Sequence, residues 1–297
     1  MIRLAIVIPF YKLEYFEETL RSISNQTDKR FKLYIGDDNS PESPVSLLNQ
    51  IFVHKENVFY KHFKTNLGSS SLTRHWERCI NLSNEEYIWL FSDDDLMPDD
   101  AVERFYKSVD VSKQVDLFRF NIQIIDKSNV QLHPVSEHPL HESAESFLKR
   151  RLNGTVISTA CEYIFSRKEF LNNGFVEFPL AWASDDATWL NYADKNGMFL
   201  IPGKCVSWRM SGDNISSTIS NYKKKAAASV AFIKLISPKY KIDNRLKLKW
   251  LTGQIDLLGK NRKMKKYFWW HILIKNTFPL GFVIISHKHI IKNLLQK

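Results

Sequence analysis

The sequence predicts an α/β protein in which a mostly parallel sheet is flanked by helices and followed by a basic helical appendage. In the first part of the chain, short apolar runs alternate with helical patterns, as expected for strands that crossover helices connect. From residue 221 the composition changes to lysine-rich helical segments with bulky aromatic side chains. We therefore expect a main domain over 1–220 and a second region over 221–297.

The expected elements of the main domain follow in chain order. Early in the chain we expect strands at 4–9, 32–35 and 87–91, and helices at 14–24 and 70–80. Right-handed crossovers between these strands would make them parallel. The middle of the domain has strand-like segments at 156–158, 163–165 and 198–201. It also has a predicted helix from Asp185 to about Asn196, which Gly197 closes as a C-terminal cap.

The cysteines and the N-terminus indicate a cytoplasmic protein. Cys79, Cys161 and Cys205 are odd in number and far apart, and they include no CxxC pair. Neither a disulfide framework nor a cysteine zinc site is therefore expected, and a reducing compartment fits best. The apolar run at 4–10 is too short for the core of a signal peptide, so we interpret it as a buried first strand.

The charge is unevenly distributed along the chain. Residues 221–297 hold 18 Lys and Arg against two acidic residues, whereas residues 1–220 hold 24 basic and 30 acidic residues. The overall charge of +10 therefore comes from the second region. This region is the expected contact surface for an acidic partner.

The strongest local signal is the run Ser92-Asp93-Asp94-Asp95, which directly follows the apolar segment YIWLF. Three adjacent carboxylates repel one another and are tolerated when water solvates them or a cation neutralises them. A solvated turn before a helix is one interpretation. The position after a buried strand favours the other, a Mg²⁺ or Mn²⁺ site, because hard carboxylate oxygens suit these ions.

A second acidic pair, Asp37-Asp38, follows an earlier predicted strand in YIGDDNS. The sequence DDNS is also typical of turns and of residues that begin helices. Ligands of open parallel sheets bind outside the carboxyl ends of the strands. Two acidic strand ends in one sheet therefore indicate a shared binding site.

These motifs together resemble family 2 glycosyltransferases, which are inverting, nucleotide-sugar-dependent enzymes with the GT-A fold. The resemblance rests on IVIPFY, SISNQT, FKLYIGDDNS, the NLG at 66–68 and EYIWLFSDDDLMP, which occur in the family's order and spacing. It is strong over about residues 1–110 and reduces to scattered matches up to residue 220.

The resemblance implies a donor site for a nucleotide sugar, with UDP as the expected nucleotide. The implied contacts to the donor nucleotide come from Pro9, Tyr11, Asp37 and Asp38, the acidic pair contacting base and ribose. The family's DxD element maps to Asp93–Asp95, with Asp93 and Asp95 as metal ligands and Asp94 toward the donor. Which of these carboxylates touches Mg²⁺ or Mn²⁺ stays open, because relatives often carry Asp-Ser-Asp-Asp here.

The resemblance also implies a general base at the start of the helix that begins near residue 184. Alignment from the WL at 189–190 makes Asp185 the base and places Ser184 at the family's Glu position, with Asp186 as the reserve candidate. Acidic residues also favour a helix N-terminus through the macrodipole. Arg209 fits the family arginine that neutralises diphosphate, whereas Ser211 stands where many relatives carry His.

The implied reaction is a single displacement that inverts the anomeric centre. Asp185 would take a proton from an acceptor hydroxyl on a glycan or lipid-linked sugar, in surface polysaccharide synthesis. A nucleotidyltransferase is an alternative, but IPFYKLEYF lacks the expected Gly-rich basic signature. The basic, aromatic tail also fits a nucleic-acid-binding protein or a membrane scaffold. Its long apolar stretches favour a membrane over nucleic acid.

The second region is expected to form helices on an anionic membrane, peripheral on the inner face of the cell membrane. Its longest apolar stretch, 278–285, falls short of the roughly 20 residues that span a bilayer. Trp269 and Trp270 suit the headgroup boundary. The alternative is that these helices pack on the main domain or on a second subunit.

Overall fold

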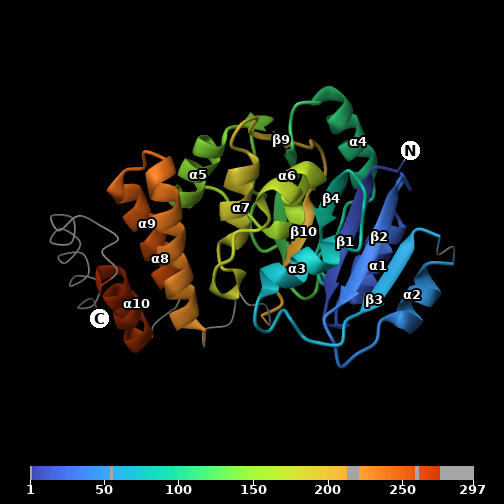
Figure 1. The fold of residues 1–297 in the computed structure, drawn as a ribbon, viewed down its shortest axis with the longest axis horizontal. Helices are drawn as coiled ribbons and strands as arrows, with labels where there is room; N and C mark the ends of the chain where they lie inside the picture. The colour runs from blue at the N-terminus through green and yellow to red at the C-terminus, as the bar shows by residue number, and fades with distance from the viewer. Residues whose placement is uncertain (1, 54–55, 213–220, 258–260, 275–297) are drawn as a thin grey trace.

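The computed structural model describes residues 2–53, 56–212, 221–257 and 261–274. Eight strands form one sheet in the order β3-β2-β1-β4-β8-β5-β9-β7, with helices on both faces (Figure 1). In that order the strands are Val58–His62, Phe31–Asp37, Leu4–Phe10, Tyr87–Leu90, Tyr163–Ser166, Leu117–Arg119, Met198–Leu200 and His141–Glu142. A smaller sheet pairs β6 (Ile122–Ile125) with β10 (Val206–Arg209).

The first half of the large sheet is parallel. Strands β3, β2, β1 and β4 pair in parallel, β5 pairs in parallel with β9, and β8 runs antiparallel between β4 and β5. The sequence LAIVIPF of β1 is almost completely buried, as expected for a strand covered on both faces. The prediction of an α/β fold with a mostly parallel sheet is confirmed.

The helices divide between the two faces of the sheet. Apolar side chains of α1 (Phe16–Ser24), α2 (Val45–Ile51) and α4 (Ala101–Val111) share one core cluster with the sheet. The opposite cluster receives α3 (Leu72–Ile80), α5 (Ala144–Asn153), α6 (Arg167–Asn173) and α7 (Ser184–Tyr192). Alternate residues of β1 enter the two clusters, which is the period of a strand.

The C-terminal helices continue the second core cluster. They are α8 (Tyr222–Lys239), α9 (Asn244–Asp256) and α10 (Arg262–Ile274), and Figure 1 shows them at the end of the molecule opposite β3 and α2. Phe232 and Trp250 pack ring to ring at 5.0 Å between α8 and α9. Phe232 also meets Phe178 of the main domain at 6.5 Å, and Gln254 of α9 accepts from Trp182, so α8 and α9 pack against the main domain, an alternative that the sequence left open. Helix α10 packs on α8, where Tyr267 meets Tyr222.

The structure bears on the expected membrane contact of two parts of the second region, the tryptophan pair at 269–270 and the apolar stretch at 278–285. Trp269 is 4% exposed and belongs to the core, so its expected place at a headgroup boundary was wrong, whereas Trp270 is 63% exposed. The apolar stretch at 278–285 lies outside the described residues. Among the helices that the structure describes, none is long and apolar enough to cross a membrane.

Most predicted elements of the main domain are present, and one is wrong. The expected helix from Asp185 is α7, but it ends at Tyr192, and Ala193 is its C-terminal cap. The predicted cap at Gly197 is therefore wrong, because this glycine, with φ of 68°, follows the turn after the helix. The segment 156–158 is irregular instead of a strand, because its Ile157 N–H donates to the Ser136 hydroxyl rather than to a neighbouring strand.

Candidate functional site

Asp93 follows β4, and its side chain binds the backbone that follows β1. Its Oδ2 accepts hydrogen bonds from the backbone N–H groups of Tyr11, at 2.8 Å, and Lys12, at 3.0 Å. Burial raises the pKa of Asp93, although these two donors oppose the shift. The expected donor-site residues Tyr11 and Asp93 therefore lie together, and Pro9 lies in β1 just before them.

Asp37 is the last residue of β2, and its side chain contacts two residues of β3. Its Oδ2 accepts from the Tyr60 hydroxyl at 2.5 Å and lies 3.0 Å from His62 Nδ1. Its Oδ1 accepts from the backbone N–H of Ser40 at 2.8 Å. The Ser40 hydroxyl in turn donates to the Tyr11 carbonyl at 2.7 Å. Asp37 and Tyr11 are thus parts of one site.

Asp38 fixes the loop that contains the NLG motif. Its two oxygens accept from the backbone N–H groups of Leu67, at 2.7 Å, and Gly68, at 2.8 Å, and the Arg78 guanidinium also donates to it. A Cβ at Gly68 would lie 2.5 Å from Asp38 Oδ2. The glycine is therefore required by the close approach of this carboxylate to the backbone.

The three carboxylates at the end of β4 differ in exposure. Asp95 is fully buried and its Oδ1 accepts from the backbone N–H of Arg209 at 2.8 Å. Burial raises the pKa of Asp95 to about 6. Asp94 remains partly exposed, and burial together with the charges of Asp95 and Asp93 raises its pKa to about 9. The ionised form of Asp94 is therefore disfavoured as long as no further positive charge lies beside it.

Arg209 is fully buried behind this segment. Its Nε donates to the Asp94 carbonyl at 2.8 Å, and its guanidinium pairs with Glu18 at 2.9 Å and stacks over the Tyr15 ring at 4.4 Å. A side chain without accessible surface cannot reach a bound diphosphate in this arrangement. The geometry thus does not support the diphosphate contact expected of Arg209.

The acidic segment fits a divalent ion that arrives with a diphosphate. Among the described residues there is no group of three or more His, Cys, Asp or Glu side chains able to hold a metal by themselves. Mg²⁺ is usually bound by one or two carboxylates together with substrate phosphates and water. Asp93 and Asp94 are both partly exposed, and Asp94 is the one whose pKa both neighbouring carboxylates raise. Asp95, expected as a metal ligand, is fully buried, and its Oδ1 links the end of β4 to β10. Its Oδ2 has no hydrogen-bond partner among the described residues.

The two acidic residues at the start of α7 have different surroundings. Asp186 is buried and accepts from Nε of Arg151 at 3.0 and 2.9 Å. Asp185 remains partly exposed. Burial and the adjacent charge of Asp186 raise the pKa of Asp185 to about 7, although Arg151 opposes this shift. Asp185 is therefore the carboxylate that can meet a substrate and titrate near neutral pH.

Ser184, at the position of the family's Glu, has a structural role. It is fully buried, and its hydroxyl accepts from the backbone N–H of Phe178 at 3.0 Å. A glutamate at this position would have to bury its carboxylate at the start of α7, because the Ser184 side chain is enclosed. Asp185 is consequently the first acidic side chain of the helix.

The start of α7 lies at the edge of the sheet that bears the acidic segment. Because β8 runs antiparallel to β4, the beginning of β8 lies beside the end of β4. Trp89 donates from Nε1 to the Cys161 carbonyl at 2.7 Å, and the charge of Asp95 contributes to the raised pKa of the Cys161 thiol. From the same end of β8, Tyr163 stacks on Trp189 of α7 at 4.7 Å and is close enough to Asp186 for that charge to raise its pKa.

Sequence reasoning missed four residues that hold the predicted carboxylates: Tyr60, His62, Arg78 and Arg151. Tyr60 and His62 lie two residues apart in β3, and both meet Asp37. Arg151 lies in the run KRR, which looks like a solvated helix face. Only the fold shows its partner, 35 residues away.

Comparison with known proteins identifies a family for this arrangement. The family model described as Glycosyl transferase family 2 matches residues 5–175, more than half of the chain. The poly(ribitol-phosphate) beta-N-acetylglucosaminyltransferase TarP of Staphylococcus aureus is 32% identical over 109 residues, which cover 36% of this chain. The matched part spans only 32% of the length of TarP.

Solved structures show the same fold over most of the chain. Staphylococcus aureus TarS 1–349 in complex with UDP-GlcNAc has a TM-score of 0.62 at 15% identity, covering 93% of this chain and 89% of that chain. The Pyrobaculum calidifontis mannosyltransferase PcManGT, in complex with GDP-Man and Mn²⁺, has a TM-score of 0.54 at 13% identity, covering 97% and 80%. These likenesses show a GT-A type fold.

Proposed function

Because the chain belongs to glycosyl transferase family 2, we propose that it is an inverting transferase that moves a sugar from a UDP-sugar to a glycan or lipid-linked acceptor in surface polysaccharide synthesis. The names of TarP, which acts on poly(ribitol-phosphate), and of the TarS complex with UDP-GlcNAc support this choice of donor and acceptor class. The proposal is carried by the partly exposed Asp185 at the start of α7, a helix that Tyr163 contacts from the end of β8 beside the acidic segment.

The donor nucleotide is proposed to bind across the ends of β1, β2 and β4. Pro9, Tyr11 and Asp37 line this edge, and Asp93 fixes the backbone at Tyr11. Asp38 acts by holding the loop at 67–68 through two backbone hydrogen bonds. Asp37 and Asp38 thus shape the site for base and ribose.

Asp94, with Asp93 beside it, is proposed to hold Mg²⁺ or Mn²⁺ against the donor diphosphate. The raised pKa of Asp94 supports this assignment, because a cation would relieve the repulsion that causes it. The bound ion would supply positive charge that stabilises the diphosphate as it leaves. Arg209 contributes by fixing the Asp94 backbone and Asp95, not by touching the donor.

Asp185 is proposed to act as the general base. Its carboxylate takes the proton of an acceptor hydroxyl, while the acceptor oxygen forms a bond to C1 of the donor sugar. The bond between C1 and the diphosphate oxygen breaks, and UDP leaves with the electron pair. Arg151 pairs with Asp186 and opposes the rise in the pKa of Asp185, to which the charge of Asp186 still contributes.

An anionic membrane is the proposed location of the acceptor, with the chain peripheral on the inner face. Lys263, Lys266 and Trp270 are exposed on α10 at helical spacing, which places them on one side of the helix. Lysines beside an exposed tryptophan are typical of helices that lie at a membrane interface. The tail's net charge of +16, from 18 basic and two acidic residues, favours an anionic surface.

A panel of nucleotide sugars tests the proposed activity. The full chain should release UDP from at least one UDP-sugar when Mg²⁺ or Mn²⁺ is present, and the release should stop with EDTA. The Asp185→Asn variant is the matched negative control. If instead the chain forms a UDP-sugar from UTP and a sugar phosphate, it is a nucleotidyltransferase and the proposal is wrong.

A further inference from the structure

We infer that the C-terminal helices α8 and α9 position the catalytic base through Trp182, a residue of the segment that leads into α7. The inference rests on the proposed function of Asp185. It assigns these helices a direct part in turnover, in addition to any contact with a membrane.

Trp182 is held from two sides by the C-terminal helices. Its indole Nε1 donates to Oε1 of Gln254, on α9, at 3.0 Å. On the other helix, Nζ of the buried Lys225, on α8, lies 4.4 Å from the centroid of the Trp182 ring. A cation over a tryptophan face is attracted by the ring, and more strongly when the pair is shielded from water. Gln254 thus holds the edge of the indole ring, and Lys225 lies over its face.

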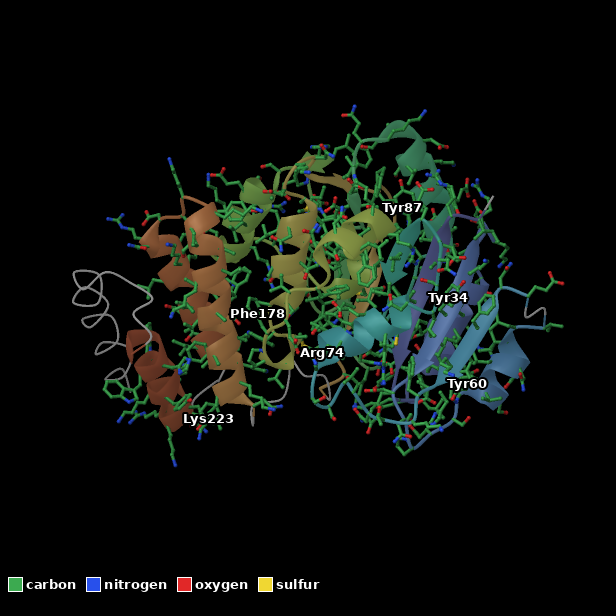
Figure 2. All side chains as sticks on the ribbon, in the orientation of Figure 1. Tyr34, Tyr60, Arg74, Tyr87, Phe178 and Lys223 are labelled. Carbon is green, nitrogen blue, oxygen red and sulfur yellow. The ribbon has the colours of Figure 1, made fainter. Side chains whose placement is uncertain are left out.

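The segment around Trp182 has a backbone that must be held in place. Leu180, Ala181 and Ala183 have φ values of 64°, 53° and 61°, in the left-handed region that residues other than glycine rarely adopt. Such conformations cost free energy and persist where the surroundings impose them. Phe178, which Figure 2 labels, adds a further contact. Its ring packs on that of Phe232 of α8, with the centroids 6.5 Å apart.

A short covalent and hydrogen-bonded path joins this segment to the base. Trp182 lies three residues before Asp185, and Ala183 is the residue from which α7 begins. The Ser184 hydroxyl accepts from the Phe178 N–H, so the segment closes back on the first turn of the helix. A shift of Trp182 therefore moves the backbone that carries Asp185.

The inference predicts a specific loss when the indole hydrogen bond is removed. Gln254→Ala and Trp182→Phe should each lower kcat about fivefold, the size expected of one hydrogen bond, with donor affinity unchanged. The double variant should lose no more than Trp182→Phe alone, because both changes remove the same bond. Rates are divided by the number of UDP sites from calorimetry, so that misfolded protein does not count. Gln50→Ala, on the distant α2, is the matched control.

Hydrogen exchange supplies a readout that needs no substrate. The amides of 178–186 should exchange faster in Gln254→Ala than in Gln50→Ala. Equal exchange overturns the inference whether or not the chain is active, and so does an unchanged kcat of Gln254→Ala in an active chain. If Gln254→Ala exchanges faster but the wild-type chain turns over no UDP-sugar, the coupling stands and the proposed function is wrong.

Discussion

Arg151 donates from Nε to both carboxylate oxygens of Asp186, at 3.0 and 2.9 Å. The pair assigns different roles to two adjacent aspartates that the sequence alone could not separate. Asp186 is buried and paired, whereas Asp185 is partly exposed and has a pKa raised to about 7. Neighbouring carboxylates with different environments are a common basis for catalytic acid–base chemistry.

The rate of transfer should rise with pH through about 7. Below this pKa Asp185 is protonated and cannot accept a proton, whereas above it the base is fully ionised. Asp186→Asn removes a charge that raises the pKa of Asp185, so the rise should move to lower pH. The pH dependence of kcat measures this shift. Asp194→Asn, beyond the C-terminal end of α7, is the control, and an unmoved profile in Asp186→Asn would contradict the coupling.

Arg209→Lys should weaken both the fold and the donor site. Lysine keeps the charge but loses the planar donor set that reaches the Asp94 carbonyl and stacks over Tyr15. We expect the free energy of unfolding in urea to fall by about 2 kcal/mol and the affinity for UDP with Mg²⁺ to fall. The control variant Arg21→Lys, at an exposed residue, should change neither the free energy of unfolding nor the affinity for UDP. Wild-type UDP affinity in Arg209→Lys would refute the proposed bracing role.

Binding of UDP should depend on the metal through Asp94. In calorimetry with Mg²⁺ or Mn²⁺, Asp94→Asn should bind UDP at least about tenfold more weakly than wild type, because one charged ligand is lost. EDTA should weaken the wild type to a similar degree and have little further effect on the variant. Asp110→Asn, at the exposed end of α4, serves as control. Equal affinity with and without EDTA in the wild type would remove the metal from the account.

The full chain should sediment with anionic liposomes at low salt and remain in solution with neutral ones. Lys263→Glu combined with Lys266→Glu should reduce binding, because each basic residue near an anionic surface contributes about 1 kcal/mol. Lys113→Glu combined with Lys127→Glu, both in the main domain, is the control with equal charge. Absence of binding by the wild type would favour a soluble acceptor.

The donor half of the fold could be predicted because its signals are local. An apolar strand followed by carboxylates occurs at Asp37 and again at Asp93, and each pattern lies within ten residues. Strand β3 was missed, because this edge strand is only partly buried and its sequence VFYKH has no clear alternation of apolar and polar residues. The segment 156–158 looked like a strand because Val156 is apolar, but that side chain fills the core from a loop.

The acceptor half depends on contacts that the sequence does not reveal. Nothing in three consecutive aspartates indicates that Asp95 is the buried one, since that follows from the pairing of Leu96 with Ser207. Arg209 fitted a diphosphate-binding arginine, yet its place in β10 buries it against Glu18, 191 residues away. Such non-local pairs are set by the topology of the sheets.

The central claim is that Asp185 is the base of a sugar transfer, and kcat of Asp185→Asn tests it most directly. With Mg²⁺ or Mn²⁺ and the UDP-sugar that the wild type uses, we predict that kcat falls about 10²- to 10⁴-fold while the affinity for UDP stays unchanged. Asp186→Asn should keep much more activity than Asp185→Asn. Wild-type turnover in Asp185→Asn would contradict the account, and so would the reverse order of the two variants.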